Sequence, residues 1–545
     1  MLKKLIGLVL VVMVLFSLAT SCAKQSPDTS TATSGTPAGT DPSATTSNAA
    51  PSASSPESNN SQQPSTGGGI LKVALTNPFT GASAINTNNP YRYSSLSQVY
   101  ETLLAFEDGK YVGVLAKEWE KTDDYTWRVT LFDNITDSNG NSFTASDVAF
   151  VFDAQKDVGH NLNIYYDQGG VKVINDTTFE FTLTTDSVGA FYLLGTQVFQ
   201  CTKASYDGSS DNLATMPVGT GPYVCTSYVE GSSCTLEKRS DYWKTENLPR
   251  ASIANPDMIE ISYIPEAVQM SMAIDSGNVQ FAGQVALSIA SEVDTFKNVT
   301  TMYISNGTFN GLGFNMQGRP VSDIKALREA VCYAIDPNGM IASVYSGHGT
   351  VMKNYGMPTA SDYDASWTTN ISYNPDMAKQ KLAEAGYPDG ITLTLLSNNV
   401  GEDSLMAEVV QGYLAAVGIT LQFDFVEPAT RNARRMEGDW DLDFVGGVGV
   451  LDMSLFWGTL YGLVGDTGMS RYFHNDSALY DIYDKFAAVG GKTPENLKAL
   501  YEYELDHVTW FPMFNKQSLY TFSGGYSDIY LNDGYQAMPY LGSIT

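Results

Sequence analysis

A strand–helix–strand pattern in the second half of the chain constrains the fold most. Residues 391–395 alternate isoleucine and leucine with threonine, residues 405–417 have helical periodicity and stop at Gly418, and residues 419–425 alternate again. Two strands joined through a helix pair in parallel, with a right-handed crossover. The sequence therefore predicts an α/β fold.

Helix start and stop signals mark further elements in the same half. Residues 323–335 have helical periodicity, and Asp336-Pro337 ends that helix and begins a second one that stops near Gly347. Asn374-Pro375 supplies a cap and a first-turn proline for the next helix, and Gly386 closes it. Helices interspersed with strands in this way are typical of the same fold class.

The first half of the chain also alternates between helical and strand patterns. An amphipathic helix is predicted from Val99, followed by a turn at Asp108-Gly109. Residues 125–131 then alternate Tyr, Trp, Val and Leu with polar residues, as a half-buried strand does. Thr144 is placed to cap a helix that begins at Ala145.

Residues 217–243 form the most specific local pattern, which is a hairpin with a defined entry and end. Their sequence is PVGTGPYVCTSYVEGSSCTLEKRSDYW. Gly219 and Gly221 allow a sharp entry turn, and Pro222 stiffens it. The hairpin turn falls at Glu230-Gly231, between two runs of alternating residues, and Asp-Tyr-Trp ends the second run.

Residues 1–22 predict export. Lys3 and Lys4 precede an unbroken apolar run over residues 5–16, which is too short to span a bilayer of about 30 Å. The next residues, Leu-Ala-Thr-Ser-Cys, end at Cys22 and have the form of a bacterial lipobox. We therefore predict a lipoprotein signal peptide whose removal leaves Cys22 to carry lipid such as palmitate. An ordinary cleaved signal peptide is the alternative.

Residues 23–69 consist mostly of Ser, Thr, Pro, Ala, Asn and Gly. Such a segment buries too little apolar surface to offset the entropy of ordering it, which predicts a disordered tether. The remaining ~475 residues exceed what one core usually organises, so two or three lobes are expected. The net charge of −28 argues against nucleic acid and anionic lipid as partners.

Four cysteines besides Cys22 lie in the rest of the chain. Cys225 and Cys234 flank the hairpin turn closely enough to pair across its strands, and exported proteins form disulfides. Two buried thiols are the alternative. Cys332 lies on the apolar side of the helix predicted over residues 323–335 and is expected in the core. No cysteine or histidine spacing indicates a metal site.

Patterns typical of enzymes occur, but each has a structural explanation. A Ser-x-x-Lys string at Ser322 fits the first motif of penicillin-recognising serine enzymes, yet Pro494 stands where their third motif requires glycine. Asp439, Asp441 and Asp443 alternate as in a calcium loop, but the glycine and glutamate that such a loop needs are missing. We therefore predict that these aspartates line the solvent-facing side of a strand. No catalytic residue, cofactor or metal is predicted.

Taken together, these patterns resemble family 5 of the bacterial extracellular solute-binding proteins, the peptide-binding subunits of ABC importers. The hairpin of residues 217–243, the segment Leu312–Pro358 and the turn Trp510-Phe511-Pro512-Met513 match the family's motifs in its order. The resemblance implies a periplasmic-binding-protein-like type II fold, with two lobes, a hinge and an extra small subdomain (cluster C). Its implied boundaries are 70–98, 216–308 and 516–545 for lobe I, 99–215 for the small subdomain and 309–515 for lobe II.

The resemblance also implies a carrier and not an enzyme. A monomer captures a small ligand between its closing lobes and delivers it to a membrane permease driven by an ATPase. A lipid anchor alone would hold it at the outer face of the bacterial cell membrane, or in the periplasm, and no cofactor is implied. The expected ligand is an oligopeptide. The alternatives are an oligosaccharide, or a surface sensor or adhesin that uses the fold without transport.

In this family an aspartate in a Gly-Trp-x-Ala-Asp-Tyr segment pairs with the α-ammonium group of the peptide. Here Gly447 stands in place of the Trp and Val450 in place of the aspartate, so a buried ammonium group is unpaired unless Asp452 replaces it. The other expected ligand-binding residues are Asn77 and Phe79 after the first strand, Asn310 near the hinge, Arg435, and the aromatic residues Phe456 and Trp457. For the last two, plain core packing is the alternative.

Overall fold

The structure is a computed structural model that describes residues 68–78, 81–86, 92–159, 162, 165–184, 188–358, 360–399, 401–427, 430–447, 453–461, 476–532 and 538–545. The predicted signal peptide, Cys22 and nearly all of the predicted tether lie outside the described residues. The predictions made for them therefore stay predictions.

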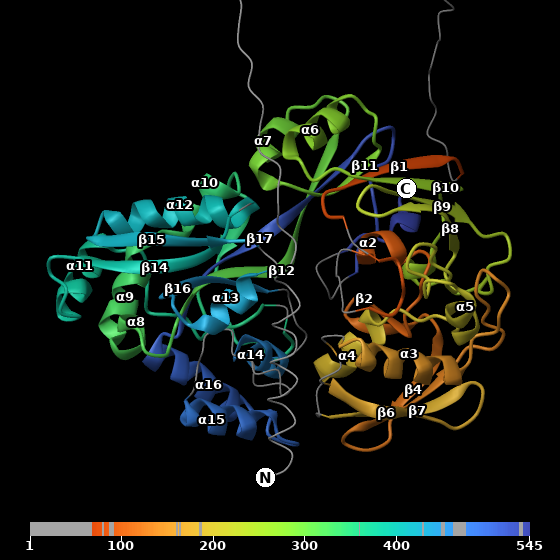
Figure 1. Cartoon of the computed structure of the whole chain (residues 1–545), viewed down its shortest axis with the longest axis horizontal. Coiled ribbons are helices and arrows are strands. Elements are labelled where there is room, and N and C mark those ends of the chain that lie inside the picture. Colours follow the sequence, from red (N-terminus) through yellow and green to blue (C-terminus); the bar gives the residue numbers. More distant parts are fainter. Residues whose placement is uncertain are drawn as a thin grey trace, which may run out of the picture. The chain divides into compact units, whose positions relative to one another are not determined.

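A mixed sheet of eleven strands organises most of the described chain (Figure 1). Its order is β15-β14-β16-β12-β17-β11-β1-β10-β9-β8, and β13 pairs with β17 off this path. These strands are β1 (Ile70–Leu75), β8 (Tyr223–Val229), β9 (Ser233–Lys238), β10 (Met258–Tyr263), β11 (Phe281–Val285), β12 (Thr300–Phe314), β13 (Gly349–Val351), β14 (Ile391–Asn398), β15 (Ile419–Val426), β16 (Leu442–Gly447) and β17 (Trp510–Phe522).

The predicted strand–helix–strand unit is confirmed. β14 pairs in parallel with β15, and α12 (Gly401–Ala415) connects them. α13 (Arg431–Glu437) then returns the chain to β16, which lies on the other side of β14. Right-handed crossovers in opposite directions place their helices on opposite faces of a sheet. Figure 1 shows α12 and α13 on opposite sides of β14 and β15 accordingly.

β12 and β17 connect the two parts of the main sheet. They pair antiparallel from Thr300 opposite Phe522 to Gly313 opposite Trp510. β11 pairs with the last residues of β17, while β16 pairs with the last residues of β12. The register between the two long strands shifts after Ser305. A bulge of this kind bends a strand pair, so the shift marks the natural position for a hinge.

A separate four-stranded sheet has the order β4-β5-β7-β6, and β2 pairs with β3. α3 (Ala145–Asp157) and α4 (Val188–Gln197) lie on one side of the four-stranded sheet (Figure 1). The predicted start of α3 is confirmed, because the carboxylate of Asp147 accepts a hydrogen bond from the N–H of Thr144 at 2.7 Å. The strands are β2 (Leu104–Glu107), β3 (Lys110–Gly113), β4 (Ala116–Lys121), β5 (Thr126–Leu131), β6 (Tyr166–Val173) and β7 (Thr178–Leu183).

The amphipathic helix predicted from Val99 is wrong. α2 covers only Arg92–Leu96, and the chain continues through turns into β2. Glu101 supplies the reason, because its buried carboxylate accepts hydrogen bonds from the Tyr242 hydroxyl at 2.5 Å and from Nε1 of Trp243 at 3.1 Å. These contacts with a distant segment outweigh a helix propensity of tenths of a kcal/mol per residue.

The helix starts predicted at asparagine and aspartate are confirmed. Asn374 caps α11 (Pro375–Glu384) by accepting the N–H of Met377 at 3.0 Å, and Asp336 caps α10 (Pro337–Val344) in the same way. The helix predicted over 323–335 is instead divided at Ile324. The remaining helices of six or more residues and the two parts of this divided helix are α5 (Lys203–Gly208), α6 (Ala267–Asp275), α8 (Pro320–Asp323), α9 (Lys325–Ala334), α14 (Met453–Tyr461), α15 (Ser477–Ala487) and α16 (Pro494–His507).

The hairpin predicted within residues 217–243 is confirmed. β8 and β9 pair antiparallel, and Gly231 in their turn has a φ of +68°, which a residue without Cβ adopts freely. The Sγ atoms of Cys225 and Cys234 lie 3.7 Å apart and are not bonded to each other. The disulfide between them stays a prediction. Cys332 is fully buried, as expected for a core residue.

The buried apolar residues gather in three large clusters. One packs the four-stranded sheet and α3 together with β1, β8, β9 and β10. A second surrounds β14, β15, α9 and α12. A third packs α14, α15 and α16 against the neighbouring ends of β12 and β17. None of the helices in the described part of the chain has both the length and the apolar character needed to cross a membrane.

Candidate ligand-binding site

The carboxyl ends of strands from both parts of the main sheet approach the middle of β17. β1 and β11 run parallel, and β11 ends at Val285 opposite Leu519. From the other part, β16 ends at Gly447 opposite Phe309 of β12, which itself lies opposite Asn515. Ligands of α/β proteins bind outside the carboxyl ends of the strands, where loops and helix N-termini gather. This edge is therefore the candidate site.

Asn77, one of the predicted site residues, follows β1 at this edge. Its Nδ2 donates a hydrogen bond to Oε1 of Gln284 at 3.2 Å, and the hydroxyl of Thr76 donates to the Gln284 carbonyl at 2.9 Å. Gln284 lies at a register shift of β11 and has a φ of +55°. Non-glycine residues rarely adopt this conformation, which occurs at turns and bulges as well as at functional sites. Sequence reasoning missed Gln284, because no local pattern marks a bulge.

Asn310, another predicted site residue, lies on β12 next to the residue that pairs with Gly447. β12 pairs with β16 so that Asn310 is opposite Gly446 and Phe309 is opposite Gly447. The Nδ2 atom of Asn310 is buried and has no hydrogen-bond partner within the described ranges. A buried donor without an acceptor costs about 1–3 kcal/mol. An acceptor from a ligand, or from residues 448–452, is therefore expected at this atom.

Gly447 has a steric reason to be glycine. A Cβ built on it would lie 2.6 Å from Cε1 of Phe309. Carbon atoms do not pack that closely, so a side chain at this position would displace the Phe309 ring. Phe309 is thus a steric reason for glycine at the position where the sequence analysis expected the family's tryptophan.

Arg435, another predicted site residue, belongs to an internal ion-pair network. Its Nε donates to Oδ2 of Asp443 at 2.5 Å, and Nη2 of Arg431 donates to Oδ1 of the same carboxylate at 2.6 Å. Arg431 also reaches Asp403 at 2.6 Å. Because the Asp443 side chain is fully buried, the main role of Arg435 is to neutralise this carboxylate.

The prediction that Asp439, Asp441 and Asp443 line the solvent-facing side of a strand is wrong. β16 begins only at Leu442, and Asp441 and Asp443 are 2% and 0% exposed. Of the three, only Asp439 is exposed. Arg319 donates to both oxygens of Asp441, at 2.9 and 3.1 Å. The carboxylates of Asp441 and Asp443 can be buried because arginines from other segments pair with them. The alternation of aspartate with apolar residues alone predicts that they are exposed to solvent.

Two further charged residues at this edge were missed by sequence reasoning. Lys516, in the middle of β17, pairs with Glu402 in the first turn of α12. Its Nζ also lies 5.7 Å from the centre of the Tyr345 ring. The only sequence signal was a lysine inside an otherwise apolar and uncharged strand pattern.

Phe456 and Trp457 are core residues in the structure. They are 3% and 1% exposed, and the Phe456 ring packs against the rings of Phe309 and Trp510. Core packing was the alternative reading for both, and the structure favours it.

The remaining predicted site residues, Phe79, Val450 and Asp452, lie outside the described residues. Whether Asp452 replaces the amine-binding aspartate therefore stays a prediction. Within the described ranges, no group of three or more His, Cys, Asp or Glu side chains could hold a metal ion.

Comparisons with known proteins identify relatives of this chain. The heme-binding protein A of Haemophilus influenzae is 27% identical over 446 residues, which cover 75% of this chain and 79% of that protein. The dipeptide-binding protein of Escherichia coli is 25% identical over 409 residues, covering 69% and 75%. A solved structure of the Helicobacter pylori binding protein DppA with the peptide STSA has a TM-score of 0.72 at 20% identity, covering 88% of this chain and 98% of that one.

The structural likeness confirms the predicted α/β fold of a type II periplasmic binding protein. Residues 110–468 match the family described as bacterial extracellular solute-binding proteins, family 5 (middle). This match covers more than half of the chain and includes β12, β14, β15 and β16. The chain therefore belongs to family 5 of the bacterial extracellular solute-binding proteins.

Proposed function

We propose that the chain is the substrate-binding lipoprotein of an ABC importer and that its ligand is an oligopeptide. The observation that carries the proposal is the Asn310 amide, a buried donor without a partner among the described residues, at the edge where strand ends of both parts meet. Membership of family 5 supports the carrier role. The likeness to a dipeptide-binding protein supports a peptide ligand.

A peptide backbone suits this edge. Its carbonyl groups are the neutral acceptors that an amide donor such as Asn310 Nδ2 needs. Binding through the backbone also places little demand on the α-ammonium group, which is consistent with Val450 in place of the family's aspartate. The ligand would be bound without chemical change, so we assign no catalytic role to any residue.

Closure of two lobes about β12 and β17 is the mechanism that we infer. The two strands continue from one part of the main sheet to the other and carry a register shift between them. A ligand that contacts both parts favours the closed state by its differential affinity for that state. A permease and an ATPase on other chains would then accept the ligand from the closed monomer.

We predict that Asn310→Ala lowers the affinity for a bound peptide about three- to tenfold, because it removes one hydrogen bond without adding a charge. The measurement is calorimetric titration with a peptide identified first by native mass spectrometry of protein purified from its own host. Asn338→Ala is the matched control, since Asn338 is exposed on α10.

Two outcomes would contradict this proposal. If Asn310→Ala binds the peptide with unchanged affinity, Asn310 does not contact the ligand. If oligosaccharides co-purify with the protein and it binds no peptide from a mixed pool, the ligand is an oligosaccharide and the peptide proposal is wrong.

We also propose a lipid anchor at Cys22. Cys22→Ala is expected to move the protein from the membrane fraction to the soluble fraction, because the anchor is the only membrane attachment that we assign. Immunoblots of the two fractions measure this change. Retention of the variant in the membrane fraction would contradict the proposal.

A further inference from the structure

A short loop, residues 345–348, lies where the two parts of the main sheet meet, and we call it the hinge loop. It connects α10 to β13, whose first residue, Gly349, is opposite Lys516 of β17. β11 ends at Val285 opposite Leu519. Because β12 occupies the other edge of β17, β11 and β13 follow one another along one edge of this strand. The hinge loop lies between them.

Two side chains of the hinge loop contact the part of the sheet that contains β11. The hydroxyl of Ser346 donates to the carbonyl of Leu287, two residues after the end of β11, at 2.9 Å. The His348 ring stacks on the Tyr303 ring, with ring centres 3.7 Å apart and planes 2° apart. Tyr303 precedes the register shift of β12, on the same side of it as β11. Both contacts therefore cross the hinge.

The backbone of the hinge loop is itself fixed to α10 and β17. The N–H groups of Tyr345 and Gly347 donate to the carbonyl of Ile341 at 3.0 and 3.1 Å, and Gly347 has a φ of +87°, which favours glycine. The carbonyl of His348 accepts the N–H of Gln517 at 3.3 Å. A loop held in this way moves with α10. A rotation about the hinge therefore changes the distances of the two contacts.

These contacts lie on one side of β12 and β17. Leu287 belongs to the second apolar cluster, together with Val344 and Tyr345 at the start of the hinge loop, and Tyr303 packs against that cluster. Figure 1 shows α6, α7 and α10 on this side of the two strands and α14 on the other side. The two parts of the sheet are thus already in contact on the α10 side.

Residues of the candidate site are associated with the other two clusters. Nε2 of Gln284 donates to Sδ of Met538, a member of the first cluster, at 3.3 Å. Gly447 is opposite Phe309, a member of the third cluster. A rotation that brings two lobes together on one side of a hinge separates them on the other side. Closure on a ligand therefore stretches the contacts made by the hinge loop.

We propose that the hinge loop opposes lobe closure and thereby lowers the affinity of the chain for its ligand. A hydrogen bond and a ring stack that exist in only one arrangement of the lobes favour that arrangement. A ligand that requires the closed state then binds more weakly, in proportion to the population of that state. The inference rests on the lobe closure of the proposed function, but not on the class of the ligand.

The test measures the positions of the lobes without a ligand. Nitroxide labels are attached at Lys203→Cys on α5 and at Lys498→Cys on α16, where the lysine side chains are 55% and 57% exposed. The Cys22→Ala protein is the background, and the other four cysteines are buried. Pulsed electron paramagnetic resonance then gives the distribution of distances between the two labels.

Ser346→Ala is expected to raise the ratio of the closed to the open population about three- to tenfold, because it removes one hydrogen bond that closure breaks. Addition of His348→Leu should raise this ratio further. Tyr303→Phe is the matched control, since it keeps the ring stack. It removes only the hydrogen bond from the Tyr303 hydroxyl to Oδ2 of Asp294, at 2.9 Å, within one part of the molecule.

Two results would overturn the proposal. The distance distributions of the wild type and Ser346→Ala could coincide, or that of the variant could move to longer distances. Ser346→Ala removes a single oxygen atom, so the comparison holds even if the double variant does not fold. Failure of the peptide proposal is recognised separately, by native mass spectrometry and the Asn310→Ala titration, because the labels report closure whatever the ligand is.

Discussion

Replacing Asp443 with asparagine is expected to lower the free energy of unfolding by about 3 kcal/mol. The Asp443 carboxylate is fully buried and lies between Arg431 and Arg435, whose side chains are 13% and 16% exposed. Asparagine keeps the shape but leaves two largely buried guanidinium groups facing a neutral amide. Urea unfolding at pH 7, with the midpoint and slope fitted together, measures the change.

The matched control is four residues earlier in the same run of aspartates. Asp439 pairs with Arg319 at 2.8 Å, but its side chain is 72% exposed. Exposed ion pairs contribute about 0–1 kcal/mol, so Asp439→Asn should change the stability by less than 1 kcal/mol. Equal losses in the two variants would show that Asp443 is not the buried partner of both arginines.

This contrast also shows why the sequence misled in the same region. Alternation of aspartate with apolar residues predicts a strand with one solvent-exposed face, because burying an unpaired charge costs too much free energy. The alternation does not tell where the arginines that pair with the buried aspartates lie. Arg431 and Arg435 are four residues apart and therefore share a helix face, which was the signal that could have identified them. The strand that this helix face covers is determined by the crossover connection between the strands, and no local sequence pattern indicates it.

Elements with local causes were predicted well. The parallel unit of β14, α12 and β15 follows from periodicity, and the caps at Asn374 and Asp336 follow from side-chain chemistry. The helix predicted from Val99 failed because Glu101 bonds to Tyr242 and other residues about 140 positions away. Such contacts override a weak local preference.

The candidate site was predictable only where it coincides with a strand end. Asn310 is opposite Gly446, and its neighbour Phe309 is opposite Gly447, across β12 and β16. Gln284 was missed, since its conformation depends on a register shift in the sheet, which no local sequence pattern indicates.

Glu504→Gln is expected to stabilise the chain increasingly as the pH rises. Glu504 is fully buried at the end of α16, where burial raises the pKa of its carboxyl to about 8 although Thr509 donates to both of its oxygens. In the unfolded chain the pKa returns to about 4.3. Between these two values the folded state holds a proton that the unfolded state has lost.

The sign follows from this difference. Where the folded state binds more protons than the unfolded state, the free energy of unfolding falls as the pH rises. The contribution of Glu504 is fully favourable below about pH 4 and is lost progressively up to about pH 8. At 1.36 kcal/mol for each pKa unit, the wild type should lose about 3 kcal/mol relative to Glu504→Gln between pH 5 and pH 8.

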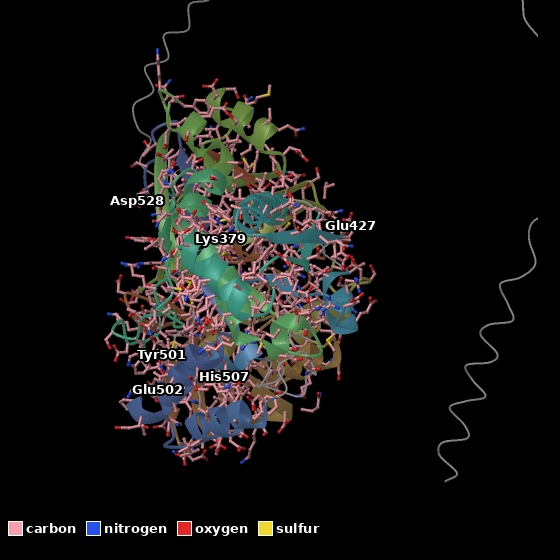
Figure 2. The ribbon with its side chains drawn as sticks, turned by 90° about the vertical axis from the view of Figure 1, so that its left-hand side faces the viewer. Lys379, Glu427, Tyr501, Glu502, His507 and Asp528 are labelled. Atoms are coloured by element: carbon pink, nitrogen blue, oxygen red, sulfur yellow. The ribbon has the colours of Figure 1, made fainter. Side chains whose placement is uncertain are left out.

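Urea unfolding of both proteins at pH 5 and pH 8 tests this expectation, with Glu502→Gln as the control. Glu502 is two residues earlier on α16, is labelled in Figure 2, and has a side chain that is 59% exposed. Its substitution should shift the stability equally at the two pH values. If the difference between wild type and Glu504→Gln does not change with pH, the carboxyl is ionised in the folded state. Arg328, which donates to the carbonyls of His507 and Val508 beside it, would then be its counter-charge.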